Sequence, residues 1–347
     1  MKPHAPLKLE EFQHAQDNIR GAAVRTPLVQ LNVDLANTEI YLKLENLQPI
    51  GSFKLRGAIN AMRSTDPEML EAGVWTASMG NMAQGVAWGA RELGIKATVV
   101  VPEDATRSKL AAMEELGASV RKIPRDAWFD LILYSHDYPD LAGLFIHPAS
   151  NRHVMAGQGT IGLEILEDLP DVNAVVTPFG GGGLTAGVAS AIQLLKPSTR
   201  RYACELNTGA PLAPSLAAGQ PVTITAELAP RYASGFSGAP SVAEEMWPIL
   251  SSVVDNSLLM SINELATTIK LLVERNHIVA EGAGAAAVAT TLAGRAGTGK
   301  IACVVSGGHI DLDELNKILN FATDAFSKKS GTNENRLTQK SPLKKIS

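Results

Sequence analysis

The order of strand-like and helix-like segments restricts the fold of this chain more than any other feature. Short apolar runs typical of buried strands alternate with amphipathic stretches whose apolar residues recur every three or four positions. We expect strands at residues 40–44, 73–77, 97–101, 174–177, 201–205 and 301–306. We expect helices at residues 82–93, 107–116, 184–195, 262–275 and 312–326. The alternation predicts an α/β fold with a largely parallel sheet, whose strand-to-helix junctions bind phosphates and substrates.

Length and composition limit the class of protein. The chain has 347 residues, and two domains are expected because single cores stop growing near about 250 to 300 residues. A net charge of −4 lacks the basic excess that attracts nucleic acid. No apolar run reaches the ~20 residues of a membrane span, and residues 1–25 lack the apolar core of a signal peptide. We therefore predict a cytoplasmic protein whose partners are small molecules or copies of itself.

Three smaller features complete the outline. Cys204 and Cys303 lie in short apolar runs, so both are expected to be buried core thiols and not a disulfide pair. Residues 133–149 are rich in turn formers and are expected to return the chain from one domain to the other. From residue 327 onward the sequence is polar and basic without hydrophobic periodicity, which predicts a disordered tail.

The first segment with chemical potential contains a lysine at a strand-to-helix junction. Residues 51–58 read Gly-Ser-Phe-Lys-Leu-Arg-Gly-Ala and open a helical pattern. Lys54 is either a solvated lysine of a first helical turn or a nucleophile. We expect Ser52 to cap the helix, and Phe53 and Leu55 to surround the amine with apolar groups, which lower the pKa of a lysine.

The second segment is a run of four glycines, Gly180, Gly181, Gly182 and Gly183, between an apolar strand and a helix that begins near Leu184. Residues without Cβ let successive backbone N–H groups converge on an anion at a helix N-terminus, so the run predicts a phosphate site. It contains neither a Walker lysine nor a GxGxxG pattern, which disfavours nucleoside triphosphates and dinucleotides.

Two further junctions carry polar residues. In the segment 78–85, Ser78 and Asn81 either cap a helix or bind a ligand. In the segment 303–311, Ser306 follows an apolar strand and is expected to face the crevice at the strand's carboxyl end. His309 is either a general base or a polar loop residue.

Together these segments resemble the fold-type II family of pyridoxal-5′-phosphate (PLP) enzymes that contains threonine and serine dehydratases and serine racemase. The resemblance covers residues 7–326 and includes Ala156-Gly157-Gln158-Gly159-Thr160 and Glu281-Gly282-Ala283-Gly284. It implies a tryptophan synthase β-like α/β fold with two open, twisted, mostly parallel sheets flanked by helices. It also implies a large PLP-binding domain of residues 1–71 and 148–326, a small mobile domain of residues 72–147, and a homodimer.

The resemblance assigns roles to individual residues. Lys54 would form the Schiff base with PLP and then act as the general base at the substrate's α-carbon. The residues implied in cofactor binding are Phe53, Lys54, Asn81, Gly180, Gly181, Gly182, Gly183, Leu184 and Ser306. The residues implied at the substrate carboxylate are Ser78, Met79, Gly80, Asn81 and Met82, and Gln84 belongs to the same motif. Ser306 would meet the pyridine nitrogen with a neutral hydroxyl, a setting that suits prompt loss of a β-hydroxyl.

The implied activity is that of a dehydratase, or ammonia-lyase. It would convert a β-hydroxy-α-amino acid to a 2-oxo acid and ammonia by β-elimination through the Lys54 aldimine. Serine racemase and hydroxyaspartate ammonia-lyase activities remain alternatives within catalysis. Two alternatives come from other classes of protein. One is a PLP-binding protein without turnover, and the other is a phosphate-sugar binding module that uses the glycine run alone.

Several positions depart from the family's pattern. Met79 replaces the serine that racemases use as a second acid, and Met82 replaces a histidine common in the dehydratases. The loop 232–236 has Ser234 where relatives often have aspartate, followed by Phe236, and His309 replaces an asparagine. These departures resemble the phenylserine dehydratase branch. Glu205 matches a cation ligand of some relatives, but no second carboxylate follows it, so no metal is expected.

Overall fold

Two separate sheets carry the strands of this chain in a computed structural model that describes residues 3–105, 107–132, 138, 141–225, 227, 229, 231–233 and 239–320. The larger sheet has the order β1-β2-β10-β7-β8-β9 and is parallel apart from the β1–β2 pair. Its strands are β1 (Leu28–Gln30), β2 (Thr38–Lys43), β7 (Ala174–Pro178), β8 (Arg200–Leu206), β9 (Asn256–Met260) and β10 (Gly299–Val304).

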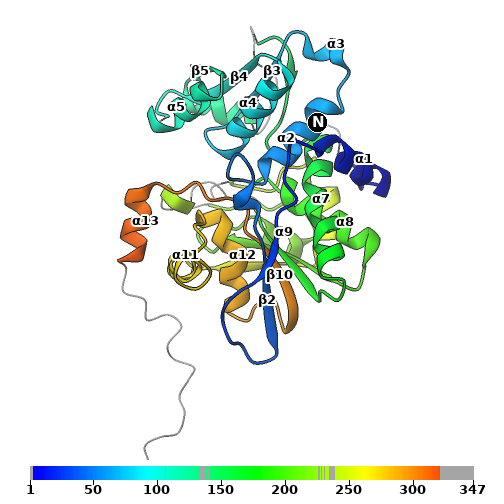
Figure 1. Ribbon diagram of the computed structural model, residues 1–347, viewed down its shortest axis with the longest axis vertical. Helices are drawn as coiled ribbons and strands as arrows, with labels where there is room; N and C mark the ends of the chain where they lie inside the picture. Colours follow the sequence, from blue (N-terminus) through cyan, green and yellow to red (C-terminus); the bar gives the residue numbers. More distant parts are fainter. Residues whose placement is uncertain are drawn as a thin grey trace, which may run out of the picture.

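The smaller sheet is parallel throughout and has the order β5-β4-β3-β6. Its strands are β3 (Val74–Ala77), β4 (Ala97–Pro102), β5 (Ser119–Ile123) and β6 (Leu144–Phe145). Figure 1 shows this sheet in the upper half of the molecule and the larger sheet in the lower half, with α2 between them. The predicted fold class, two mostly parallel sheets flanked by helices, is confirmed.

The helices of the described residues cover both sheets. They are α1 (Leu9–Ile19), α2 (Lys54–Arg63), α3 (Pro67–Leu70), α4 (Asn81–Leu93), α5 (Arg107–Glu115), α6 (Arg125–Asp130), α7 (Arg152–Asp168), α8 (Gly183–Leu195), α9 (Leu212–Ala218), α10 (Trp247–Val253), α11 (Ile262–Asn276), α12 (Gly282–Leu292) and α13 (Leu312–Leu319), with short 3₁₀ turns η1 (Glu45–Leu47) and η3 (Arg231–Ala233). Within the described part of the chain, none of them combines the length and apolar character needed to cross a bilayer.

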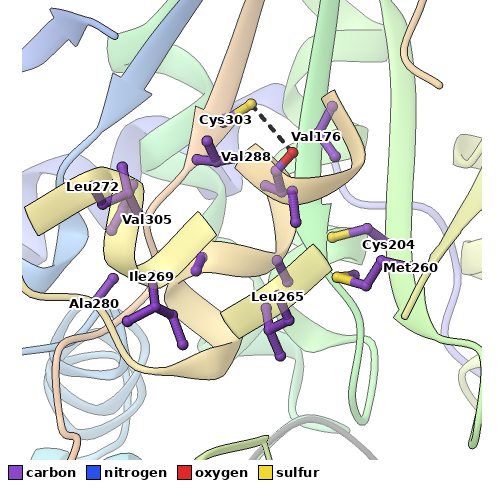
Figure 2. Packing of buried hydrophobic residues seen from close by; sticks show 14 of the residues in the cluster. Val176, Cys204, Met260, Leu265, Ile269, Leu272, Ala280, Val288, Cys303 and Val305 are labelled. Atoms are coloured by element: carbon purple, nitrogen blue, oxygen red, sulfur yellow. Dashed lines mark hydrogen bonds between the residues drawn. The ribbon is translucent and has the colours of Figure 1, made fainter. Parts of the chain in front are cut away.

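The central strands of the larger sheet are buried on both faces, as in sheets covered by helices on each side. Neighbouring residues of one strand therefore enter different cores: Val175 packs with α7 and α8, and Val176 packs with α11 and α12. Figure 2 shows the second core, which contains Leu265 and Ile269 of α11 together with Val288 of α12. Cys204 and Cys303 are buried there as free thiols, and burial raises the pKa of Cys303 to about 12.

Some expected boundaries differ from the structure. The strand expected at 301–306 ends at Val304. The helix expected at 312–326 is described as Leu312–Leu319, and residues 321–326 lie outside the described residues. The four edge strands β1, β5, β6 and β9 were not predicted. β1 and β6 have only three and two residues, and β5 lacks an apolar run, whereas β9 has three buried residues and was overlooked. Residues 133–137 and 139–140 of the expected return segment, and the whole tail from 327, lie outside the described residues.

Candidate active site

Lys54 is the first residue of α2, and a pair of backbone contacts fixes the position of its turn. Ser52 forms an isolated antiparallel bridge with Gly307, and the Phe53 N–H donates to the Ser306 carbonyl at 3.0 Å. The start of α2 is therefore attached to the residues that follow β10. The expectation that Ser52 caps the helix is wrong: Phe53 occupies the cap position, and the buried Ser52 hydroxyl has no hydrogen-bond partner in the described part of the chain.

The Lys54 amine lies in apolar surroundings. Nζ donates to the Pro148 carbonyl oxygen at 2.5 Å and lies 5.1 Å from the centroid of the Phe53 ring. Burial lowers the pKa of Lys54 from its ordinary value to about 8, because desolvation disfavours the ammonium form. Phe53 lies beside the amine as expected, whereas Leu55 packs in a separate apolar cluster with Ile19 and Ile59. A substantial fraction of the amine is therefore neutral, and nucleophilic, near physiological pH.

The four glycines form the turn between β7 and α8, close to the Pro148–Ser150 segment. Gly182 precedes α8 with a φ of 86°, a left-handed conformation that glycine adopts without strain. A Cβ on Gly181 would lie 2.7 Å from the Ala149 Cβ, and one on Gly183 would lie 2.7 Å from the Ala149 oxygen. No side chain caps α8. The turn thus presents the first N–H groups of a 13-residue helix to an anion.

The loop between β3 and α4 brings the smaller sheet to the same place. Asn81 begins α4, and its Nδ2 donates to Glu281 Oε1 at 2.6 Å, a contact between residues 200 positions apart. A Cβ on Gly307 would meet both side chains, 3.1 Å from Asn81 Nδ2 and 2.4 Å from Glu281 Oε1. The Asn81–Glu281 pair therefore lies directly beside the segment that carries Ser306.

Within that loop, Ser78 Oγ accepts the Gly80 N–H at 3.3 Å, so Ser78 shapes the turn while Gly80 occupies the cap position. Met79 packs against the apolar clusters of the smaller sheet. Met82 departs from its expected place: its side chain is 1% exposed and lies inside the core between α4 and the sheet. Only the backbone of Met82 can therefore reach the loop implied at the substrate carboxylate.

Ser306 is 1% exposed, and its hydroxyl has no hydrogen-bond partner among the described residues. His309 places its ring against Gly51, with Cε1 3.0 Å from the point where a Cβ would lie, and burial lowers the pKa of His309. His309 thus packs behind the Lys54 turn. Ser234 and Phe236, which the sequence also singled out, lie outside the described residues.

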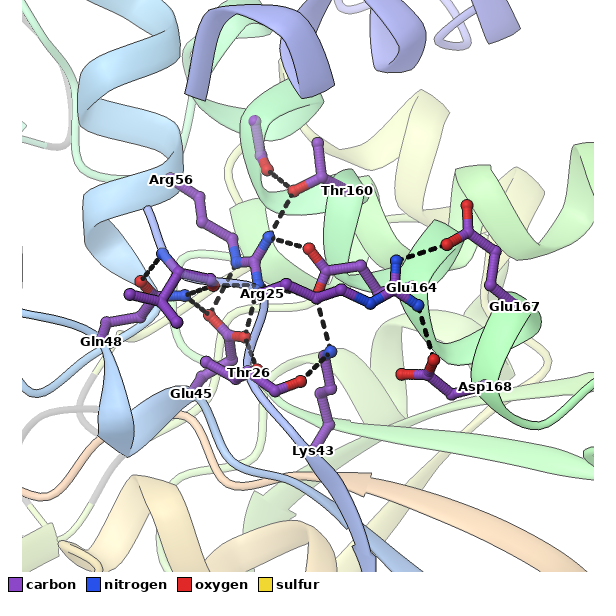
Figure 3. A network of polar contacts seen from close by, with 12 residues as sticks. Arg25, Thr26, Lys43, Glu45, Gln48, Arg56, Thr160, Glu164, Glu167 and Asp168 are labelled. Atoms are coloured by element: carbon purple, nitrogen blue, oxygen red, sulfur yellow. Dashed lines mark hydrogen bonds and ion pairs between the residues drawn. The ribbon is translucent and has the colours of Figure 1, made fainter. Parts of the chain in front are cut away.

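A buried ion-pair network holds the helix that carries Lys54 (Figure 3). Arg56 makes paired hydrogen bonds to Glu45 and to Glu164, at 2.6 to 2.9 Å. Lys43 of β2 lies 2.5 Å from Glu164 of α7 and donates to the Thr26 carbonyl. The two cations, Arg56 and Lys43, therefore balance the two carboxylates. Their ion pairs and hydrogen bonds connect α2, α7 and β2 close to the Lys54 turn.

The buried Glu205 binds backbone N–H groups at the start of α9. Its carboxylate accepts the backbone N–H groups of Leu212 and Ala213, at 2.9 and 3.0 Å, and the Ser257 hydroxyl at 2.6 Å. These three donors take three of the roughly four acceptor positions of the carboxylate. Across the described ranges, no group of three or more His, Cys, Asp or Glu residues is arranged to hold a metal ion.

The structure therefore joins the four segments into one site. Lys54 touches Pro148, Ala149 contacts the glycine turn, Phe53 bonds to the Ser306 segment, and Gly307 adjoins Asn81. The roles of Glu281 and of the turn at residues 147–150 were missed. The sequence shows Glu281 within a family motif, but no local pattern indicates that the 147–150 turn would reach Lys54.

The residues at this site fit PLP. A partly neutral lysine is suited to carbonyl chemistry, and the uncapped glycine turn is suited to a phosphate. The unpartnered hydroxyl of Ser306 is suited to a ring nitrogen. A buried hydroxyl without a partner among the described residues is costly, and a ring nitrogen at this place would satisfy it.

Comparisons with known proteins agree with a PLP site at these residues. The sequence profile of the family described as pyridoxal-phosphate dependent enzymes matches residues 19–307. The L-threonine ammonia-lyase of Thermotoga maritima is 38% identical over 319 residues, which cover 90% of this chain and 78% of the relative. The catabolic L-threonine dehydratase of Escherichia coli K12 is 35% identical over 323 residues, which cover 91% and 97%.

Solved structures show the same architecture. Maize serine racemase superposes with a TM-score of 0.82 at 28% sequence identity, covering 90% of this chain and 97% of that one. The family match at residues 19–307 includes the strands of both sheets and all the segments that form the site.

Proposed function

Because the chain belongs to the pyridoxal-phosphate dependent enzyme family and uses PLP as its cofactor, we propose that it is an ammonia-lyase for a β-hydroxy-α-amino acid of the threonine type. The observation that carries the proposal is Lys54, a buried amine whose pKa is lowered to about 8 at the meeting point of the glycine turn, Ser306 and the Asn81 loop. L-threonine would yield 2-oxobutanoate and ammonia, with the water lost on elimination returned on hydrolysis.

When bound, PLP supplies an electron sink for negative charge at the substrate's α-carbon. Lys54 is where the cofactor would attach, and its freed amine would take the α-proton as general base, since a pKa near the working pH suits proton transfer. Backbone N–H groups from Gly180 to Leu184 would hold the phosphate.

The remaining residues would orient the reactants. The Ser306 hydroxyl would meet the ring nitrogen, and Phe53, against which the Lys54 amine lies, would line the ring's pocket. The loop Ser78–Gly80, with Asn81 and the backbone of Met82, would bind the substrate carboxylate. Because Asn81 belongs to the smaller sheet, we propose that residues 72–147 act as a small domain whose closure excludes water from the reacting groups.

Elimination is favoured over racemization by Met79. Its thioether has no proton to give to the opposite face of the α-carbon, and the side chain packs against apolar clusters. A phenylserine substrate is a finer alternative that the sequence suggested through Met82 and Phe236. Since the Met82 side chain lies in the core, threonine is the substrate we propose.

The test is 2-oxo acid formation by the purified protein with L-threonine, L-serine and L-threo-phenylserine, alongside a Lys54→Ala control. We expect turnover of L-threonine and none in the control. Faster turnover of phenylserine would replace the substrate assignment. D-serine formed from L-serine without oxo acid would show a racemase, and bound PLP without any product would show a binding protein.

A further inference from the structure

The turn that connects β6 to α7 is organised by one buried histidine. His147 is 8% exposed, and its Nδ1 accepts two backbone N–H groups, from Ala149 at 3.0 Å and from Ser150 at 2.5 Å. Its Nε2 lies 3.0 Å from the carbonyl oxygen of Ile132. Both ring nitrogens are thus engaged with backbone groups, on opposite sides of the ring.

These contacts determine the tautomer of the ring. A nitrogen that accepts two N–H groups carries no proton, and a nitrogen beside a carbonyl oxygen must donate one. His147 is therefore neutral, with its proton on Nε2. In this form it acts as a fixed connector and not as an acid or base.

The turn that His147 holds forms one wall of the candidate site. The Pro148 carbonyl oxygen accepts the hydrogen bond from the Lys54 amine, and Ala149 fills the space against Gly181 and Gly183. We propose that His147 is a positioning residue that sets the place of the Lys54 amine and of the phosphate turn together. The proposal deepens the proposed function and rests on Lys54 and the glycine turn as the cofactor's attachment points.

The Nε2 side of the His147 ring connects the turn to the smaller sheet. Ile132 follows α6, which packs beside β4, while Phe145 of β6 meets the His147 ring edge-on at 5.9 Å. Thr76 of β3 also donates to the Ile146 carbonyl at 2.8 Å. A displacement of the smaller sheet would therefore be transmitted through His147 to the carbonyl that holds Lys54.

Two variants separate the two sides of the ring. In His147→Asn the amide oxygen can take the place of Nδ1 and accept the turn's N–H groups, but the link to Ile132 is lost. In His147→Leu both are lost. Ser150→Ala is the matched control, because it removes a hydroxyl from the same turn, where it contacts His4, and keeps the backbone N–H.

The measurements use the full-length protein: the dissociation constant for PLP, the melting temperature without PLP, and the imidazole ¹⁵N shifts of the wild type. We expect His147→Leu to raise the PLP dissociation constant at least about tenfold, because buried N–H groups lose their acceptor. His147→Asn should stay within about threefold, since it keeps that acceptor. Ser150→Ala should match the wild type, and the shifts should show a proton on Nε2 alone.

Unchanged PLP affinity in His147→Leu overturns the role of His147 and leaves the proposed function intact. If both variants lose the same amount of PLP affinity, and their melting temperatures fall to the same extent, then His147 contributes only ordinary packing. A protonated Nδ1 in the wild type also refutes the proposal, and does so even if the leucine variant fails to fold. A wild type that binds no PLP removes the cofactor assignment itself, together with this inference.

Discussion

Two serines of the candidate site, Ser52 and Ser306, are buried with hydroxyls that no group of the described residues satisfies. Leaving a buried hydroxyl unpaired costs about 1–3 kcal/mol. Removing such a hydroxyl should therefore not destabilise the protein, because no hydrogen bond is broken. The loss of the hydroxyl should matter only when the missing partner is bound. Measurements on the protein with and without that partner can therefore separate the two cases.

Ser306→Ala is the corresponding prediction. We expect a melting temperature without PLP that equals or exceeds that of the wild type, and a PLP dissociation constant raised about five- to tenfold, the value of one hydrogen bond. Ser190→Ala is the control, since the Ser190 hydroxyl on α8 is also buried and unpartnered. Its PLP affinity should not change. A Ser306→Ala protein that melts early and binds PLP normally would contradict the assignment.

The pKa of Lys54 predicts how cofactor attachment depends on pH. Only the neutral amine can attack, and burial lowers the pKa of Lys54 to about 8. The rate of PLP attachment should therefore rise with pH and level off above about 8, instead of continuing to rise toward the ordinary lysine value. Stopped-flow absorbance after PLP addition to the stripped protein measures this rate. A midpoint near the ordinary lysine value would show that the amine is solvated.

At the scale of the elements, the ion-pair network explains how a short helix holds its first residue in place. α2 has ten residues, and its own cap makes no side-chain hydrogen bond. Its position depends on Arg56, which joins it to η1 and α7. The arginine is fully buried, so its charge must stay paired for the helix to remain seated.

Arg56→Met should therefore cost about 3–5 kcal/mol of unfolding free energy, because it leaves two buried carboxylates short of a partner. Figure 3 also shows a matched control: Arg25 pairs with Glu167 and Asp168, but its side chain is 49% exposed. Arg25→Met should cost less than about 1 kcal/mol. Urea denaturation of the PLP-free proteins measures both. Equal losses would mean that burial does not distinguish the two arginines.

For the whole molecule, the Asn81–Glu281 hydrogen bond joins the two sheets across the site. Asn81 lies at the N-terminus of α4 and Glu281 at that of α12, so the bond links the helix that packs on the smaller sheet to the segment beside Ser306. Hydrogen bonds to charged groups contribute about 1.5–3 kcal/mol, which makes this bond a strong link between the two parts.

Glu281→Ala should accordingly speed amide hydrogen exchange in the first turn of α4 about tenfold or more, which corresponds to the loss of one charge-assisted bond. Glu281→Gln keeps an acceptor without the charge, and its exchange should fall between those of the alanine variant and the wild type. Exchange rates that are the same in all three proteins would show that this contact does not hold the smaller sheet.

Much of the fold could be read from local pattern. The apolar runs at 97–101 and 174–177 became β4 and β7, and the amphipathic stretch at 262–275 became α11, within one residue at each end. Hydrophobic periodicity works here because it reflects burial of the segment's own face, which neighbouring residues encode together. The edge strands β1, β5 and β6, with little buried surface, left no such pattern.

The sequence by itself determined the fold class, the junctions where chemistry gathers, and the residue types found there: the lysine, the glycine run, Asn81 and Ser306. Only the tertiary structure decided that Pro148 holds the Lys54 amine, that Glu281 binds Asn81, and that the Met82 side chain turns into the core. Those contacts join residues 94 and 200 positions apart, or depend on which face of a helix meets its sheet. Such choices arise from how whole elements pack, and no short segment of sequence contains that information.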